Sequence, residues 1–347
     1  MAAKKSSSPR PRWRIRRFLT LVLVLAGLLA ADGAWQLHRG MSIPQGAVHE
    51  VIAGSAFNAN LAELSARGYF ANGRQRWYLA AYVRWRHADS LIKAGEYALA
   101  PGMSPLDMLA LWQSGKAILH ELRLIEGWRF SQAWEVIRAS PDLVHTLDDD
   151  SAARFLEKLN HGDVAAEGRL FPDTYRFPKG TSDLAFLKTA NVALEKILEA
   201  EWAGRASGLP YEDPAQALVM ASIVEKESAR ADERPLIAGV FVRRLRLGMR
   251  LQTDPTVIYG LGERYDGDIH SRDLTRDTPY NTYTRTGLPP TPICLPSRES
   301  IRAALHPDDG NTLFFVARGD GSHQFSATLE EHNAAVKRLL ARTGDRK

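Results

Sequence analysis

The chain has 347 residues, of which 45% are hydrophobic and 24% charged, with a formal net charge of +5. This length and composition predict about two domains, most of which fold around a real core. Seven positive charges and no acid lie in residues 1–17, so the total of +5 leaves −2 for residues 18–347. Because nucleic-acid binding needs a basic patch on the folded domain itself, we expect no nucleic acid as a partner.

An apolar run, FLTLVLVLAGLLAADGAWQL, occupies residues 18–37. It has the length of about 20 residues that a bilayer span needs. Asp32 lies near its far end, and Trp35 suits an interfacial anchor. The basic residues before it predict a cytoplasmic tail (1–17), a transmembrane helix (18–37) and a chain that continues outside the inner membrane. The alternative is a cleaved signal peptide, since LLAADGA contains small residues.

Residues 38–120 read as a small mixed module. GAVHEVIAG has strand character, and NANLAELSARGYF and RWYLAAYVRWRHA have the apolar spacing of helices. A strand over Gly95 to Leu99 precedes a Pro-Gly turn and a helix that Ser104 caps and Gly115 ends. This arrangement fits either a carbohydrate-binding module or a structural spacer.

Residues 121–347 have a different character. A strand-like run, HELRLIEGWRF, precedes a helix that we expect Ser131 to cap. We expect a structured loop over residues 167–183, helices over about 184–204, 214–229 and 235–247, then loop-rich chain with short strands, and a final helix at LEEHNAAVKRLLAR.

Two glutamates stand two residues apart in the apolar run ALVMASIVEKES, which starts at Ala217. At about 100° per residue, Glu227 falls in the middle of an apolar helix face and Glu225 falls on the opposite side. The apolar face consists of Val219, Met220, Ile223 and Val224. Burial raises the pKa of a carboxyl group, which prepares it to donate a proton near neutral pH. The alternative for Glu227 is a buried ion pair with Arg230 or Arg234. For Glu225 we favour structural support or a solvated face.

Polar residues follow on the predicted loops. The first cluster contains Gln252 and Asp254, and the second contains Tyr280, Asn281 and Tyr283. Aromatic, amide and hydroxyl groups interleaved on loops suit sugar recognition, although ordinary loop chemistry explains each one singly. The sequence has no HExxH, GxSxG, Walker or GxGxxG motif, and His306 and His323 are isolated. Cys294 is the only cysteine, so we expect neither an intrachain disulfide nor a Cys-based metal cluster.

Several long strings resemble the MltG/YceG-like endolytic murein transglycosylases. They include ASIVEKES, RLRLGMRLQTDPTVIYGLG, YNTYTRTGLPPTPI, AALHPDDGNTLFFVA and HQFSATLEEHN, and they cover about residues 45–340 with EGWRF, EGRLFPDTY and the KAGEY region. The resemblance implies an α+β protein with a transmembrane helix, a LysM-like module (38–120) and a mixed catalytic domain with a helical core (121–347). The approach Arg276-Asp277-Thr278 departs from the family pattern, so the shape of that loop is open.

The resemblance also implies an activity. A member of this family cleaves the MurNAc–GlcNAc β-1,4 bond inside nascent peptidoglycan strands and leaves a 1,6-anhydro-MurNAc end, which helps to terminate strand elongation. Its catalytic glutamate is the second of the Glu-Lys-Glu triplet, here Glu227, and Gln252 and Tyr280-Asn281 correspond more loosely to sugar-binding residues. We expect Glu225, Asp254 and Tyr283 to assist in substrate binding, no metal or cofactor, and peptidoglycan synthases (penicillin-binding proteins) as partners.

Two other functions compete with this hypothesis. A muramidase-type hydrolase of the same bond needs a second carboxylate, for which Asp254 is the candidate. A non-catalytic glycan-binding scaffold of the cell-wall machinery has no need for a desolvated acid at Glu227.

Overall fold

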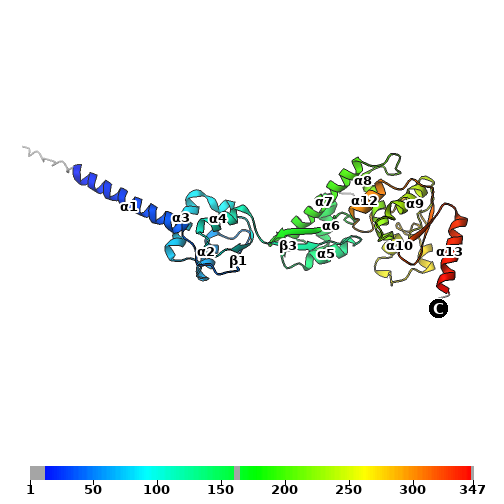
Figure 1. The fold of residues 1–347 in the computed structure, drawn as a ribbon, viewed down its shortest axis with the longest axis horizontal. Helices are drawn as coiled ribbons and strands as arrows, with labels where there is room; N and C mark the ends of the chain where they lie inside the picture. The colour runs from blue at the N-terminus through cyan, green and yellow to red at the C-terminus, as the bar shows by residue number, and fades with distance from the viewer. Residues whose placement is uncertain (1–11, 160–164, 345–347) are drawn as a thin grey trace, which may run out of the picture. The chain divides into compact units, whose positions relative to one another are not determined.

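A computed structural model describes residues 12–159 and 165–344 (Figure 1). The chain divides into two compact units, one of residues 1–120 with 178–180 and one of residues 121–177 with 181–347. Helices and short strands occur in both units, which confirms the mixed α+β class. The first residues of the predicted basic tail lie outside the described residues. The domain boundaries given above and the LysM-like resemblance stay predictions.

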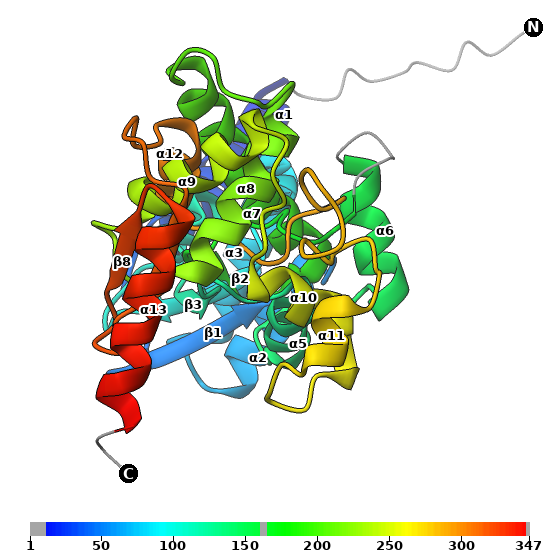
Figure 2. The same ribbon diagram turned by 90° about the vertical axis from the view of Figure 1, so that its right-hand side faces the viewer.

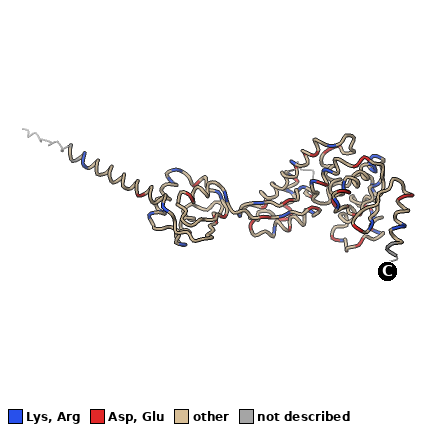
Figure 3. Tube along the Cα trace, in the orientation of Figure 1, with Lys and Arg blue, Asp and Glu red and all other residues tan. Residues whose placement is uncertain are grey.

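The first helix, α1 (Arg12–His38), is long and apolar enough over Ile15–His38 to cross a membrane, with a mean hydropathy of 2.0. It begins six residues before the predicted span because the preceding arginines are good helix formers. Figure 3 shows the span as an almost uncharged helix, in which Asp32 is the one acid. The helix is therefore consistent with a single-pass membrane anchor.

The rest of the first unit is a two-stranded sheet packed against three helices. Its elements are β1 (Ala47–Val51), α2 (Phe57–Ala66), α3 (Gly73–Arg86), η1 (Ala88–Leu91), β2 (Gly95–Leu99) and α4 (Pro105–Ser114). β1 and β2 pair antiparallel. Ser104 caps α4 in a capping box with Asp107, and Gly115 ends it in the left-handed region, as predicted. Tyr97, Met108 and Trp112 are fully buried at the centre of this unit.

The second unit begins with small paired strands and helices. These are β3 (Leu119–Arg123), α5 (Phe130–Ala139), β4 (Leu143–Val144), α6 (Asp149–Leu159), β5 (Thr174–Pro178), β6 (Thr181–Ser182) and α7 (Asp183–Ala203). β3 pairs with β5, and β4 pairs parallel with β6. The remaining elements are α8 (Pro214–Glu227), α9 (Arg234–Arg246), α10 (Asp254–Leu261), η2 (Gly262–Arg264), α11 (Ser271–Thr275), α12 (Arg298–Leu305), β7 (Phe314–Ala317), β8 (His323–Ser326) and α13 (Leu329–Gly344).

Helix α8 is the centre of the second unit. It packs against α7, α9, α10 and α12, and every residue from Ala217 to Val224 is buried. The one-sided apolar face expected from the helical wheel is therefore wrong for this helix, because Leu218 and Ser222 on the other side are buried too. Strands β7 and β8 form an antiparallel hairpin that packs against helix α13, and β7 also contacts α9 (Figure 2).

Other elements also differ from the sequence predictions. Helix α5 begins one residue before Ser131, and the Gln132 side chain accepts the Arg129 N–H in place of a serine cap. The expected loop over residues 167–183 contains β5 and β6, and α10 and α12 occupy chain that we expected to be loops and strands. We interpreted the Gly and Pro residues in these stretches as signs of loops. Pro255, however, stands at the start of α10, where the N–H that it lacks would have no partner within the helix.

Candidate active site

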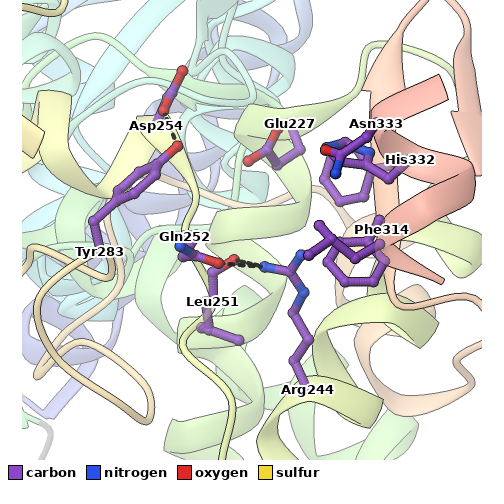
Figure 4. Close-up of a pocket in the computed structure, with 11 residues that line it drawn as sticks. Glu227, Arg244, Leu251, Gln252, Asp254, Tyr283, Phe314, His332 and Asn333 are labelled. Carbon is purple, nitrogen blue, oxygen red and sulfur yellow. Dashed lines mark hydrogen bonds between the residues drawn. The ribbon is translucent and has the colours of Figure 1, made fainter. Parts of the chain in front are cut away.

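A cavity of about 460 Å³ lies in the second unit, at the C-terminal end of α8 (Figure 4). This volume is within the range of about 300–1,000 Å³ that is common for ligand sites. Four of the sequence-predicted site residues line it together: Glu227, Gln252, Asp254 and Tyr283. Its other walls come from Arg244, Leu251, Phe314, Phe315, Leu329, His332 and Asn333.

Glu227 is the last residue of α8 and is partly exposed to the cavity. Burial of its carboxyl group raises the pKa from 4.5 to about 7. A hydrogen bond from the Thr253 hydroxyl opposes this rise, the charge of Asp254 adds to it, and His323 also opposes it. Near neutral pH the group is therefore present in both protonation states, which is the condition for giving and taking a proton.

The segment before α10 holds the Thr253 hydroxyl against this carboxyl group. Gln252 adopts the left-handed region with a φ of 51°, which is uncommon for a residue with a side chain. Its N–H donates to Thr282 O at 3.1 Å, and the Thr253 N–H donates to Thr282 Oγ1 at 3.0 Å. Thr282 thus accepts both N–H groups, one at its carbonyl and one at its hydroxyl, and maintains the turn that presents Thr253 to Glu227.

Asp254 and Tyr283 form a second polar pair in the cavity. Asp254 begins α10, and its Oδ1 accepts the Tyr283 hydroxyl at 2.6 Å. Burial and this carboxylate raise the pKa of Tyr283, so the phenol remains a donor. The pair places negative charge opposite Glu227 in the view of Figure 4.

Arg244 joins the cavity to the hairpin. The buried guanidinium donates to Leu313 O and Leu251 O at 2.7 and 2.8 Å and lies over the Phe314 ring at 5.1 Å. The His332 ring also stacks on the Phe314 ring, with 5.3 Å between the two ring centroids. Burial and Arg244 lower the pKa of His332, which keeps its ring neutral. Its buried Nδ1 atom has no hydrogen-bond partner among the described residues.

Glu225 is not in this cavity. Its side chain is only 6% exposed and pairs with Arg234 at 3.2 Å. It also accepts hydrogen bonds from the Ser297 N–H, the Ser297 hydroxyl and the Ser300 hydroxyl. Both carboxylate oxygens therefore have partners within the protein, as expected for structural support and not for a solvated face. The geometry gives the expected role in substrate binding no support, and Arg234 is not the partner of Glu227.

Tyr280 and Asn281 do not line the cavity either. The Tyr280 hydroxyl bonds with Thr291 Oγ1 at 2.8 Å, and its ring packs on Tyr259. Asn281 is 1% exposed, and its amide donates to the carbonyl oxygens of three residues between 273 and 276 while its oxygen accepts the Tyr283 N–H. Asn281 thus shapes the loop that carries Tyr283. The same loop is closed by Asp277 and Arg285, whose ion pair lowers the pKa of Asp277 to about 2.

No group of three or more His, Cys, Asp or Glu side chains in residues 12–159 and 165–344 is arranged to hold a metal ion. Cys294 is buried, and its thiol donates to Ser222 O. His323 pairs with Glu233 at 2.6 Å, so it has a structural role beside the site.

Comparison with known proteins gives this cavity a family context. The model of the YceG-like family matches residues 49–338. The chain belongs to the YceG-like family. The endolytic murein transglycosylase of Bacillus subtilis strain 168 is 33% identical over 283 residues, which cover 75% of this chain and 76% of that protein.

Two further relatives agree with it. The endolytic murein transglycosylase of Streptococcus pneumoniae serotype 2 is 27% identical, and the match covers 93% of this chain and 65% of that protein. A 2.6 Å crystal structure of a YceG-like protein from Listeria monocytogenes is similar in fold, with a TM-score of 0.52 and 30% identity, over 84% of this chain and 98% of that one.

Sequence reasoning missed several residues of the cavity in this YceG-like chain. Thr253 stood between two residues that we selected, but a lone threonine carries no signal of its own. Arg244 was hidden in a run of arginines, RRLR, that reads as a solvated face. Phe314, His332 and Asn333 lie in strings that carried the family resemblance, but only the fold brings the hairpin and α13 to the end of α8.

Proposed function

We propose that this chain is an endolytic murein transglycosylase in which Glu227 acts first as the general acid and then as the general base. The observation that carries this proposal is one carboxyl group at the cavity wall, with a pKa of about 7 and a hydroxyl donor beside it. The Bacillus subtilis and Streptococcus pneumoniae relatives are both named endolytic murein transglycosylase, which supports the same reaction class. The substrate is a peptidoglycan glycan strand, and the bond cleaved is the β-1,4 bond between MurNAc and GlcNAc.

In the first step, protonated Glu227 gives its proton to the glycosidic oxygen. The bond between that oxygen and the MurNAc anomeric carbon breaks, and positive charge develops on the ring. The carboxylate of Asp254, held by Tyr283, lies in the same cavity and stabilises that charge electrostatically. The Thr253 hydroxyl stabilises the Glu227 carboxylate that the proton transfer leaves behind.

In the second step, the Glu227 carboxylate takes the proton of the sugar's own C6 hydroxyl. The C6 oxygen bonds to C1 and closes the 1,6-anhydro ring, so no water enters the product. One carboxyl group returns to its starting state after both steps. A second carboxylate is therefore not needed for nucleophilic or water-activating work, unlike in a hydrolase.

Mass spectrometry of purified sacculi digested by the chain tests this proposal. Anhydro ends are expected, and they should disappear with Glu227→Gln. Reducing ends would instead favour a muramidase that uses Asp254 to activate water. The variant Asp254→Asn separates the roles further: a slower reaction with unchanged anhydro product supports an electrostatic role. Binding without any cleavage would favour a glycan-binding scaffold.

The first unit and the anchor complete the proposal. Helix α1 spans the inner membrane once, with the N-terminus in the cytoplasm and the catalytic unit in the periplasm. The module of residues 38–120 is LysM-like and binds glycan, so residues 45–115 should pellet with insoluble peptidoglycan. A reporter fused after Lys347 should be active only if it folds in the periplasm. In this position the enzyme acts on nascent strands beside the peptidoglycan synthases and helps to terminate their elongation.

A further inference from the structure

Helix α3 carries an outer face that the described residues of the first unit leave largely exposed, and the start of α2 borders it beside Trp77 and Arg84. Its core face consists of Gln75, Leu79 and Val83, which are buried. Trp77 and Trp85, by contrast, are 63% and 73% exposed, although tryptophan is among the side chains that gain most from burial. The helix also contains four arginines and no acid, a charge of +4 within 14 residues.

The contacts between α1 and α3 show which way this outer face points. Close to the module, the Gln75 amide donates to Gln36 O and Arg39 O at 3.2 and 2.8 Å. Further along α1 toward its N-terminus, the Tyr78 ring lies so close to Gly33 that an added Cβ would be 3.0 Å from it.

Asp32, the residue before Gly33 on α1, forms an ion pair with Arg74 of α3 at 3.2 Å. At about 100° per residue around α3, Gln75 is at 0°, Tyr78 at about 300° and Arg74 at about 260°. The residues of α3 that contact α1 therefore lie nearer to the outer face of α3 the closer their partner is to the N-terminus of α1. Since Trp85 is at about 280° and Trp77 at about 200°, the two indoles flank Arg74 on that side.

The depth of these contacts is also defined. Asp32 lies five residues before the end of the apolar run at Leu37, so Arg74 meets α1 about 8 Å below that end. Trp35 on α1 is exposed as well, with Arg39 over its ring at 4.8 Å. The Tyr78 ring contacts Gly33, two residues from Trp35, and lies 5.0 Å from the Trp77 ring, so the three aromatic side chains lie near one level along α1, as expected at a membrane–water interface. Figure 1 shows α3 beside the end of α1 where the module begins.

From these observations we infer that the outer face of α3, defined by Arg74, Trp77, Arg84 and Trp85, docks on the anionic phospholipid surface of the membrane that α1 spans. This inference rests on the proposed anchor. The indoles enter the interface and the arginines contact lipid phosphates, as in an interfacial amphipathic helix. The docked face fixes the module against the bilayer and leaves the rest of its surface for glycan.

Site-specific fluorescence on the full chain tests the inference. Cys294→Ser removes the one native thiol, and its hydroxyl can still donate to Ser222 O. Single cysteines at 77 and 85 then carry an environment-sensitive label, in mixed phosphatidylcholine–phosphatidylglycerol vesicles that contain doxyl lipid. A face inserted about 5–10 Å into the headgroup region lies within reach of a doxyl group on the upper acyl chain, so both labels should be quenched.

Control positions separate the possible failures. A label at Leu25, inside the span, should be quenched, and one at Lys116, an exposed position after α4, should not. The change Arg84→Glu should reduce quenching at 77 and leave it at Leu25 unchanged. Quenching at Leu25 but not at 77 and 85 overturns the docked face and leaves the anchor intact. No quenching at Leu25 overturns the anchor and the inference with it. Unquenched labels at 77 and 85 that added glycan strands shield from an aqueous quencher would assign the face to glycan instead.

Discussion

Replacing Glu227 by Gln should inactivate the enzyme and stabilise its fold at the same time. Gln has the same shape, and its oxygen can still accept the Thr253 hydroxyl, but it has no proton to exchange. Loss of a general acid–base group costs about 10²–10⁴-fold in rate. The loss here should be at the upper end, since one group serves both steps.

The effect on stability follows from the pKa of this group. In the unfolded chain Glu227 ionises near pH 4.5, whereas in the folded protein its pKa is about 7. Below pH 4.5 it is protonated in both states, so wild type and variant should have equal stability. As the pH rises through 7, folded wild type must carry a buried carboxylate, and it loses up to about 3 kcal/mol relative to the variant.

Thermal unfolding between pH 4 and 9 measures this difference. A gain of about 3 kcal/mol corresponds to a rise in Tm of roughly 6–12 °C for a unit of this size. The gap should open between pH 5 and 8 and then stay constant. Glu212→Gln, at an exposed position two residues before α8, is the matched control and should show no such gap. A gap that does not change with pH, or a variant that still forms anhydro ends, would refute the reasoning.

Three other substitutions separate support from chemistry. Glu225→Gln leaves Arg234 buried without its charge partner, so urea unfolding at pH 7 should show a loss of about 3–5 kcal/mol; near-normal stability would contradict the buried pair. Thr253→Val removes the donor to Glu227, so the pKa of Glu227 rises further and the alkaline limb of the kcat/KM profile should move to higher pH; an unmoved limb would mean that the bond has no effect. Asn281→Ala should lower stability by about 1–3 kcal/mol through unsatisfied carbonyls, and KM should change only together with Tm, because Asn281 acts through the loop that carries Tyr283. A raised KM at unchanged Tm would show that Asn281 contacts the sugar.

Local chemistry explains which parts of this structure were predictable. Ser104 and Gly115 bound α4 because capping depends on residues next to the helix, and strand β2 follows from its own alternation. The helical wheel selected Glu227 for a one-sided apolar face that does not exist, since residues 217–224 of α8 are all buried, whereas the family resemblance selected it independently. Its distinction from Glu225 comes from partners 72 and 75 residues away, Ser297 and Ser300, which no helical wheel contains. Arg244 and His332 were missed for the same reason: their roles depend on which segments meet in space.

The bonds of Arg244 have a consequence for motion. One guanidinium holds the carbonyl oxygens of residues 250 and 251 on one side and of residue 313 on the other. The segment that presents Thr253 and the hairpin at β7 therefore cannot open separately, because release of either one leaves a buried cation short of acceptors. Amide hydrogen exchange should accordingly report both segments as one cooperative unit with a common opening free energy. When a glycan strand enters the cavity, the segment before α10 and the hairpin at β7 therefore move together or stay in place together.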